Sequence, residues 1–307
     1  MEAINSCPLC RSPKLNYLYP TSDRMFELPG RFAIRRCAKC HLWILSPRPS
    51  IDNLNKYYPK QNYYAYKAHQ SGFFSKLRDY MVRHYYRPSL LSKIISTLVH
   101  EVPALPQKLP GGRILDIGCG AGETLLLLRS LGWQVYGLEI DRQAVKVAQK
   151  RGLTDVKYGG YRDLAKYSDN YFDAVRLYHV FEHLDDPLLC LRLIARKVKK
   201  GGEVIIGTPN SGSFAARLFK RYWYNLDSPR HLFLFNPKLL EKLASQAGLR
   251  PRKVEFCSAG GLIGSLQYYL REKNGLRMQL IHQPVLVILF YRSEEHTSEL
   301  QSPDHLV

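Results

Sequence analysis

The first residues that could do chemistry are four cysteines near the N-terminus, which form two C-x-x-C pairs. The pairs are Cys7 with Cys10 and Cys37 with Cys40. Two such turns, separated by a hairpin-length segment, offer four thiolates to a tetrahedral Zn²⁺ ion. Because four cysteines close the coordination shell, we expect this zinc to be structural and not catalytic. The spacing predicts a zinc ribbon over residues 1–50, with a small core that depends on the metal.

A second chemical pattern is the glycine-rich bend Gly118-Cys-Gly-Ala-Gly122, which follows an apolar run and opens a helical one. Glycines at such a turn let the backbone approach a ligand closely. Glu139 lies about twenty residues further on, where a carboxylate can accept both hydroxyls of a ribose. Asp116 stands just before the bend, and its carboxylate would attract an ammonium and repel a pyrophosphate. The pattern therefore favours S-adenosylmethionine, which has an ammonium and no phosphate, over NAD.

Histidine and glutamate side chains beyond the bend are suited to proton transfer. His179 follows the fourth expected strand, Glu182 and His183 come one turn later, and His231 lies in a later segment. Histidine suits a general base because its pKa lies near neutrality. A structural role is the alternative, since Glu182 and His183 also precede an Asp-Asp-Pro helix start. We expect the four residues to supply the acid and base.

Alternating strands and helices from residue 113 onward predict a doubly wound α/β sheet that positions these residues. The expected strands cover 113–117, 134–138, 155–158, 172–177, 203–206 and 252–256, and the expected helices cover 123–131, 142–151, 187–198 and 237–247. The glycine bend then lies at the carboxyl end of the first strand, where open α/β sheets bind ligands.

The remaining segments divide the chain further. Residues 51–109 form a connector rich in Tyr, Arg and Lys, with helices expected over 51–58 and 73–100. Its aromatic residues can stack bases or pack a helix onto the next domain, and their regular spacing favours packing. The connector precedes the nucleotide-binding domain, 110–291. Residues 292–307 resemble a translated sequencing-library adapter, and we treat them as non-native.

The composition is that of a globular protein with a sizeable core, since 45% of its 307 residues are apolar and 23% are charged. Lys and Arg number 45 against 26 Asp and Glu, and the formal charge of +19 favours anionic partners. These basic residues are scattered, which argues against a nucleic-acid footprint. No apolar run approaches the roughly 20 residues of a membrane span, and the N-terminus has no signal-peptide pattern. We therefore expect a cytoplasmic protein without an integral membrane segment.

The ordered motifs over about residues 110–250 resemble those of class I methyltransferases that use S-adenosylmethionine. They are Ile114-Leu-Asp-Ile-Gly-Cys-Gly-Ala-Gly122, Gly137-Leu-Glu139, Phe172-Asp-Ala-Val175, Glu182-His-Leu-Asp-Asp-Pro187 and Gly201-Gly-Glu-Val-Ile-Ile-Gly-Thr-Pro-Asn210. With the cysteine module ahead of them, they are similar to a bacterial subgroup associated with surface-glycan or secondary-metabolite pathways. The resemblance implies a Rossmann-like sheet of order 3-2-1-4-5-7-6, whose seventh strand falls near 285–290 or is missing.

The resemblance also implies which residues contact the cofactor. They are Asp116, Gly118, Cys119, Gly120, Gly122, Glu139, Ile140, Asp163 and Tyr178. The family usually has an acidic residue after the third strand that meets the adenine amino group. This chain departs from that pattern with Gly159-Gly-Tyr-Arg-Asp163, so either Asp163 serves or the contact is made by backbone only. In related sugar C-methyltransferases, the pair matching Glu182 and His183 is a proposed acid and base.

For the acceptor, we expect a small molecule or a (nucleotide-)sugar or glycan intermediate, methylated on oxygen or carbon. The segment at about 207–236 would cover it, and Arg230 there could bind a phosphate or carboxylate or be solvated. The alternative is an rRNA or tRNA methyltransferase whose zinc ribbon grips RNA. Less favoured alternatives are a cofactor-binding module without turnover and a peripheral membrane protein attached through the helix expected over 73–100.

Overall fold

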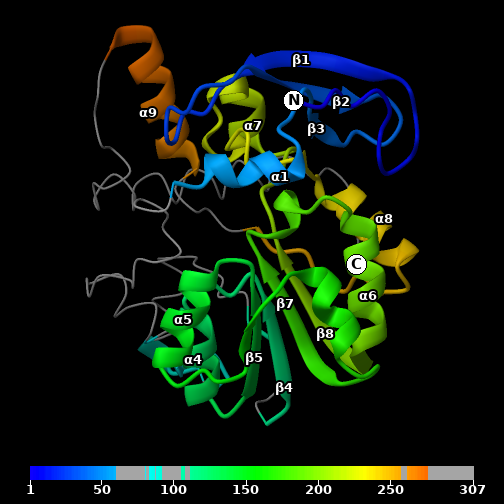
Figure 1. The fold of residues 1–307 in the computed structure, drawn as a ribbon, viewed down its shortest axis with the longest axis vertical. Helices are drawn as coiled ribbons and strands as arrows, with labels where there is room; N and C mark the ends of the chain where they lie inside the picture. The colour runs from blue at the N-terminus through cyan, green and yellow to red at the C-terminus, as the bar shows by residue number, and fades with distance from the viewer. Residues whose placement is uncertain are drawn as a thin grey trace.

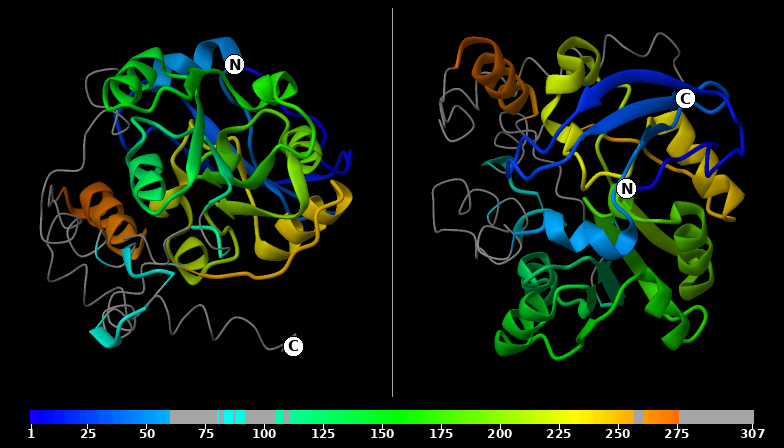
Figure 2. Two further views of the ribbon diagram at one scale, coloured as in Figure 1. Left: turned by 90° about the horizontal axis from the view of Figure 1, so that it is seen from below. Right: turned by 45° about the horizontal axis from the view of Figure 1, so that its top comes forward.

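The computed structural model describes residues 1–59, 80, 83–86, 88–91, 105–107, 111–256 and 261–275. In this part of the chain a five-stranded parallel sheet carries helices on both faces, and a four-stranded antiparallel sheet lies against one end of it (Figure 1). Figure 2 shows the same arrangement from two other directions. The expectation of a Rossmann-like α/β domain is confirmed.

The parallel sheet has the order β6-β5-β4-β7-β8, which is 3-2-1-4-5 in the numbering of the expected strands. Its strands are β4 (Arg113–Ile117), β5 (Gln134–Glu139), β6 (Val156–Tyr158), β7 (Phe172–Tyr178) and β8 (Val198–Gly207). All four pairings are parallel, so the strands' carboxyl ends meet at one edge of the sheet. This edge carries the glycine bend and the residues expected to do chemistry.

Helices cover the two faces of the parallel sheet, and their starts follow the expected signals. Asp141 caps α5, and Asp186 and Asn236 cap α6 and α8 just before a proline. The helices are α4 (Glu123–Ser130), α5 (Arg142–Lys150), α6 (Pro187–Lys197) and α8 (Pro237–Gln246). Figure 1 shows α4 and α5 on one face and α6 and α8 on the other. All four agree with the expected helices to within one residue at either end.

The expected strand over 252–256 is wrong, because residues 251–256 have no regular structure. The segment alternates charged and apolar residues, which imitates a half-buried strand. Its apolar side chains Val254 and Phe256 are instead 43% and 48% exposed, so no buried face holds them in a sheet. The helix expected over 73–100 lies mostly outside the described residues. The seventh strand near 285–290 and the tail 292–307 lie wholly outside them.

The antiparallel sheet joins the N-terminal module to a distant part of the chain. Its strands, in spatial order, are β1 (Leu15–Thr21), β2 (Phe32–Cys37), β3 (Trp43–Leu45) and β9 (Phe233–Leu234). Strand β9 follows the parallel sheet in sequence, yet it pairs with β3 through Trp43 opposite Leu234. Buried side chains of both sheets, including Ile44, Phe233 and Leu177, belong to one hydrophobic cluster. The N-terminal module therefore shares its sheet and its core with the rest of the protein.

A buried guanidinium strengthens this junction. The side chain of Arg230 is fully buried and donates to both carboxylate oxygens of Asp23, at 3.0 and 2.8 Å. Its Nε also donates to Asp227 at 3.0 Å, and one terminal nitrogen donates to the backbone oxygen of Tyr57 at 3.0 Å. The expectation that Arg230 binds a phosphate or carboxylate of the acceptor, or is solvated, is wrong, because this chain's own carboxylates occupy it.

The other described helices are short, except for α9. They are α1 (Ile51–Leu54), followed by a 3₁₀ turn over Asn55–Tyr57, then α7 (Phe214–Phe219) and α9 (Gly261–Asn274). The helix expected over 51–58 is thus confirmed as one helical turn and a 3₁₀ turn. Within the described ranges, no helix has the length and apolarity needed to cross a membrane.

We expect Arg230→Met to lower the free energy of unfolding by about 3–5 kcal/mol, because Asp23 and Asp227 would stay buried without their partner. Urea denaturation measures the change. Arg196→Met is the matched control, since the Arg196–Asp169 ion pair is mostly exposed and its loss should leave the free energy of unfolding nearly unchanged. Equal losses of unfolding free energy in both variants would show that the buried ion pairs of Arg230 do not stabilise the attachment of the N-terminal module.

Candidate functional site

The glycine bend has a backbone conformation that favours glycine. Gly118, Gly120 and Gly122 have φ angles of 71°, 56° and 81°, in the left-handed region. A Cβ atom on Gly118 would lie 2.3 Å from Val180, and one on Gly122 would lie 2.2 Å from a Leu153 methyl carbon. The bend therefore places bare backbone at the carboxyl end of β4, as a closely bound ligand requires.

Glu139 ends β5 beside this bend, and its carboxylate is held by backbone N–H groups. Gly120 N–H donates to Oε2 at 2.8 Å and Asp141 N–H donates to Oε1 at 2.9 Å. Burial raises the pKa of Glu139, while these backbone bonds act to lower it. Each oxygen keeps a second lone pair, so the carboxylate can accept the two hydroxyls of a ribose.

Two other expected cofactor residues lie at the adjacent carboxyl ends. Ile140 follows Glu139 with its side chain 69% exposed, so it offers an apolar surface for a flat ring. Asp163 follows β6 and accepts from the N–H of Gly160 at 2.9 Å. The ion pair with Lys166 and this backbone bond lower the pKa of Asp163. Its carboxylate therefore orders the turn on which it lies.

Asp116 is placed as expected, but it has a partner that the sequence analysis missed. Both carboxylate oxygens accept from one guanidinium nitrogen of Arg176, at 3.0 and 2.9 Å. Asp116 and Arg176 lie opposite each other on β4 and β7, and both are buried. Burial raises the pKa of Asp116, although the Arg176 charge acts to lower it. The signal for Arg176 was a charged residue in the middle of the apolar stretch Ala174–Tyr178 of this strand.

The expected acid and base residues do come together, around the carboxylate of Glu182. Glu182 is fully buried, and its Oε2 accepts from the Thr208 hydroxyl at 3.1 Å. Its Oε1 has no hydrogen-bond partner among the described residues. Nδ1 of His179 lies 3.3 Å from that oxygen, and Nε2 of His231 lies 3.8 Å from it. Residues that directly follow β7 and the residue His231, which precedes β9, thus meet at the carboxylate of Glu182.

His183 and His231 form the buried side of this group. Their rings are 4.7 Å apart between centroids. His183 Nδ1 lies 3.0 Å from the backbone oxygen of Arg230 and 3.1 Å from the hydroxyl of Tyr58. His231 Nδ1 lies 2.8 Å from the backbone oxygen of Asn225. Since a carbonyl can only accept, both Nδ1 atoms carry protons, and in the neutral form of each ring the lone pair is on Nε2.

The pKa values of Glu182 and His183 are both shifted from their ordinary values in this cluster. Burial would raise the pKa of Glu182, but the contact with His179 and the charges of His231 and His183 outweigh it and lower the pKa to about 2. Burial and the neighbouring His231 lower the pKa of His183 to about 4. Glu182 is therefore an anion at neutral pH, and His183 is harder to protonate than an ordinary histidine. His179 is the exposed member, with 41% of its side chain accessible and a left-handed φ of 54°.

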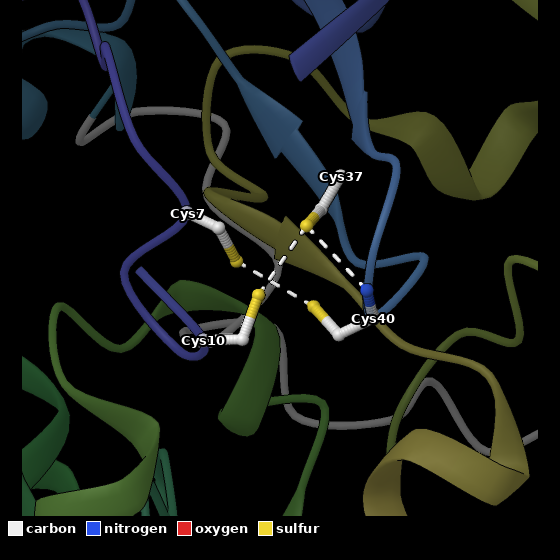
Figure 3. A group of neighbouring side chains, drawn as sticks. All are labelled: Cys7, Cys10, Cys37 and Cys40. Carbon is white, nitrogen blue, oxygen red and sulfur yellow. Dashed lines mark hydrogen bonds between the residues drawn. The ribbon is translucent and has the colours of Figure 1, made fainter. Parts of the chain in front are cut away.

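The four N-terminal cysteines converge as predicted, and Figure 3 shows their sulfur atoms facing one another. Cys7 Sγ lies 3.5 Å from Cys40 Sγ, and Cys10 Sγ lies 3.5 Å from Cys37 Sγ. All four sulfurs lie within 4.8 Å of one another and form no disulfide. Ligands at about 2.3 Å from a tetrahedral zinc are separated by roughly 3.8 Å, so the arrangement fits that ion. The hydrogen bond between Cys7 and Cys40 lowers the pKa of Cys7 to about 5 and raises the pKa of Cys40, so the two thiols share one proton in the absence of a metal.

Comparison with known proteins gives a consistent result. A family described as a methyltransferase domain matches residues 83–254. The ubiquinone biosynthesis O-methyltransferase of Xanthomonas campestris is 36% identical over 107 residues, which cover 33% of this chain and 45% of that protein. The protein of the same description from Bordetella bronchiseptica is 30% identical over 159 residues, covering 47% and 64%. The chain thus spans less than two thirds of the length of these curated relatives.

Solved structures are similar to the chain at lower identity. A SAM-dependent methyltransferase from Archaeoglobus fulgidus is 23% identical with a TM-score of 0.43, covering 71% of this chain and 92% of that one. A putative sarcosine dimethylglycine methyltransferase from Galdieria sulphuraria is 20% identical with a TM-score of 0.44, covering 74% and 81%.

We expect Arg176→Met to lower the free energy of unfolding by about 3–5 kcal/mol, because Asp116 would remain buried without a partner. The double variant Asp116→Leu with Arg176→Met should recover most of that loss, since it removes both buried charges. Urea denaturation of the wild type, both single variants and the double variant measures the coupling. Additive losses would mean that the two side chains do not stabilise each other.

Proposed function

Because the chain belongs to the methyltransferase-domain family and so to the methyltransferase class of enzymes, we propose that it methylates a hydroxyl oxygen of a small-molecule or sugar acceptor. The observation that carries this proposal is the buried Glu182 carboxylate beside the exposed His179, at the same sheet edge as the glycine bend. When bound, S-adenosylmethionine supplies a methyl group on a positively charged sulfur. The protein must then orient the acceptor and accept its proton.

The cofactor-binding residues proposed from the sequence suit this ligand. Glu139 would accept the ribose hydroxyls, while the backbone of the glycine bend allows close approach. Ile140 would pack on the adenine ring, with Asp163 ordering the turn beside it. Asp116 remains the proposed partner of the ammonium, as half of an ion pair with Arg176. One negative and one positive group side by side suit an amino-acid moiety that carries both charges.

His179 is the proposed general base. Its side chain is partly exposed at the sheet edge, so it can reach an acceptor, whereas His183 and His231 are more buried. With its Nδ1 turned toward the Glu182 carboxylate, the ring presents Nε2 to the acceptor hydroxyl. Nε2 would take the hydroxyl proton as the oxygen forms its new bond to carbon. Methyl transfer to oxygen agrees with the described activity of the ubiquinone biosynthesis relatives.

The cysteine cluster is proposed to hold a structural zinc ion. The sulfur separations of 3.5 Å and the lack of any fifth ligand residue in the described cluster support a closed, four-thiolate site. Cys37 ends β2, and the turn through Cys40 leads into β3, which pairs with β9. The ion would therefore stabilise the sheet that holds the segment bearing His231.

We expect Glu139→Gln to weaken S-adenosylmethionine binding by about 10- to 100-fold, because a hydrogen bond to a buried charge contributes roughly 1.5–3 kcal/mol. Isothermal titration calorimetry measures the dissociation constant. Glu241→Gln makes the same change on α8 and should bind as the wild type does. If the wild type binds NAD but not S-adenosylmethionine, the proposed function is wrong.

We expect His179→Ala to reduce the turnover number by about 10²- to 10⁴-fold, the usual contribution of a general base, with cofactor affinity unchanged. Formation of S-adenosylhomocysteine is measured with a panel of phenols, catechols and nucleotide-sugars. His84→Ala is the control, because His84 bonds the backbone oxygen of Tyr80 away from this group. Methylation of RNA, with salt-sensitive RNA retention and no activity on the panel, would favour the RNA methyltransferase alternative.

A further inference from the structure

We propose that Glu182, His183 and His231 form a binding site for one divalent first-row metal ion, distinct from the four-cysteine cluster. One carboxylate oxygen and one ring nitrogen from each histidine lie within 4.8 Å of one another. Ligands at about 2.1 Å from a tetrahedral ion are separated by roughly 3.4 Å. The 3.8 Å between Glu182 Oε1 and His231 Nε2 would need only a small contraction.

The hydrogen bonds around the histidines are those that a metal site requires. His183 and His231 each direct an Nδ1 proton to a backbone carbonyl, of Arg230 and Asn225 respectively. Metal-binding histidines commonly donate their second ring N–H to such a group, which fixes the tautomer and the ring. In the neutral rings both lone pairs are therefore on Nε2. The carboxylate oxygen Oε1 of Glu182 accepts no hydrogen bond from the described residues, and its nearest ring nitrogen is Nδ1 of His179 at 3.3 Å.

The charges around the cluster point to a cation with two positive charges. Glu182, Asp23 and Asp227 are carboxylates with side chains at most 8% exposed, and Arg230 is the cation that pairs with the two aspartates. These three carboxylates and one guanidinium sum to a formal charge of −2. Buried carboxylates that outnumber their cationic partners are poorly compensated, so the group favours binding a cation.

The ligand types restrict the identity of the ion. Two imidazoles and one carboxylate suit Zn²⁺, Fe²⁺ or Co²⁺, whereas Mg²⁺ and Ca²⁺ prefer oxygen ligands. Three protein ligands leave a fourth position open, as in catalytic zinc sites. As a consequence that rests on the proposed function, an acceptor hydroxyl could take this position and lose its proton more readily to His179.

The test is the zinc content of the intact chain after removal of metal, reconstitution with Zn²⁺ and removal of excess, measured by plasma mass spectrometry. We expect about two zinc ions per wild-type chain and about one in Glu182→Gln and in His231→Ala. Cys37→Ser should keep the ion at Glu182. In calorimetric titration, the Glu182→Gln site should bind Zn²⁺ at least about 100-fold more weakly.

Controls separate this site from misfolding and from the proposed function. His84→Ala is matched to His231→Ala, because His84 also contacts a backbone carbonyl through Nδ1 but belongs to no cluster of possible metal ligands among the described residues, and it should keep both ions. Glu182→Gln preserves side-chain shape, and its circular dichroism should equal that of the wild type. The proposal is wrong if the wild-type chain holds one zinc ion and the Cys37→Ser variant loses that ion. It is also wrong if a folded His231→Ala variant still holds two zinc ions. Neither measurement uses cofactor or acceptor, so the proposed function can fail independently.

Discussion

The structure depends on the burial of one guanidinium between two carboxylates from distant parts of the chain. Arg230 joins Asp23 in the N-terminal module to Asp227 in the segment before β9. A charge that is fully buried is stable only with such partners, so the three residues must stay together. The backbone oxygen of Arg230 also holds Nδ1 of His183, and the next residue is His231. The ion pairs of Arg230 that attach the N-terminal module therefore also help to position His183 and His231.

This junction connects the two sheets of the described residues. The parallel sheet presents β4, β5 and β7 with their carboxyl ends at one edge. Strand β3 pairs with β9, and Leu232 N–H donates to the backbone oxygen of Glu182 at 2.9 Å. The hydrophobic cluster continues from one sheet into the other. The N-terminal module thus covers the carboxyl edge, and the start of the connector contributes Tyr58 to the site.

Much of the parallel sheet could be predicted from sequence, because its signals are local. Apolar strands, the glycine bend and the helix caps at Asp186 and Asn236 each determine nearby backbone. The β3–β9 pairing joins residues about 190 positions apart, and no local pattern encodes it. Arg176 and Arg230 were missed or misread for the same reason, since their partners are known only once the strands are placed. The strand expected over 252–256 failed because alternation without burial does not make a strand.

Burial of the site has a consequence for the proposed chemistry. Transfer of a methyl group from a sulfonium to a deprotonated oxygen reduces two opposite charges as the transition state forms. Water stabilises the separated charges more than the transition state, so a site that excludes water favours the reaction. Glu182 is fully buried, and His231 is 8% exposed beneath the N-terminal module. Loss of the module's attachment would therefore slow methyl transfer by admitting water, even where His179 and the cofactor-binding residues keep their places.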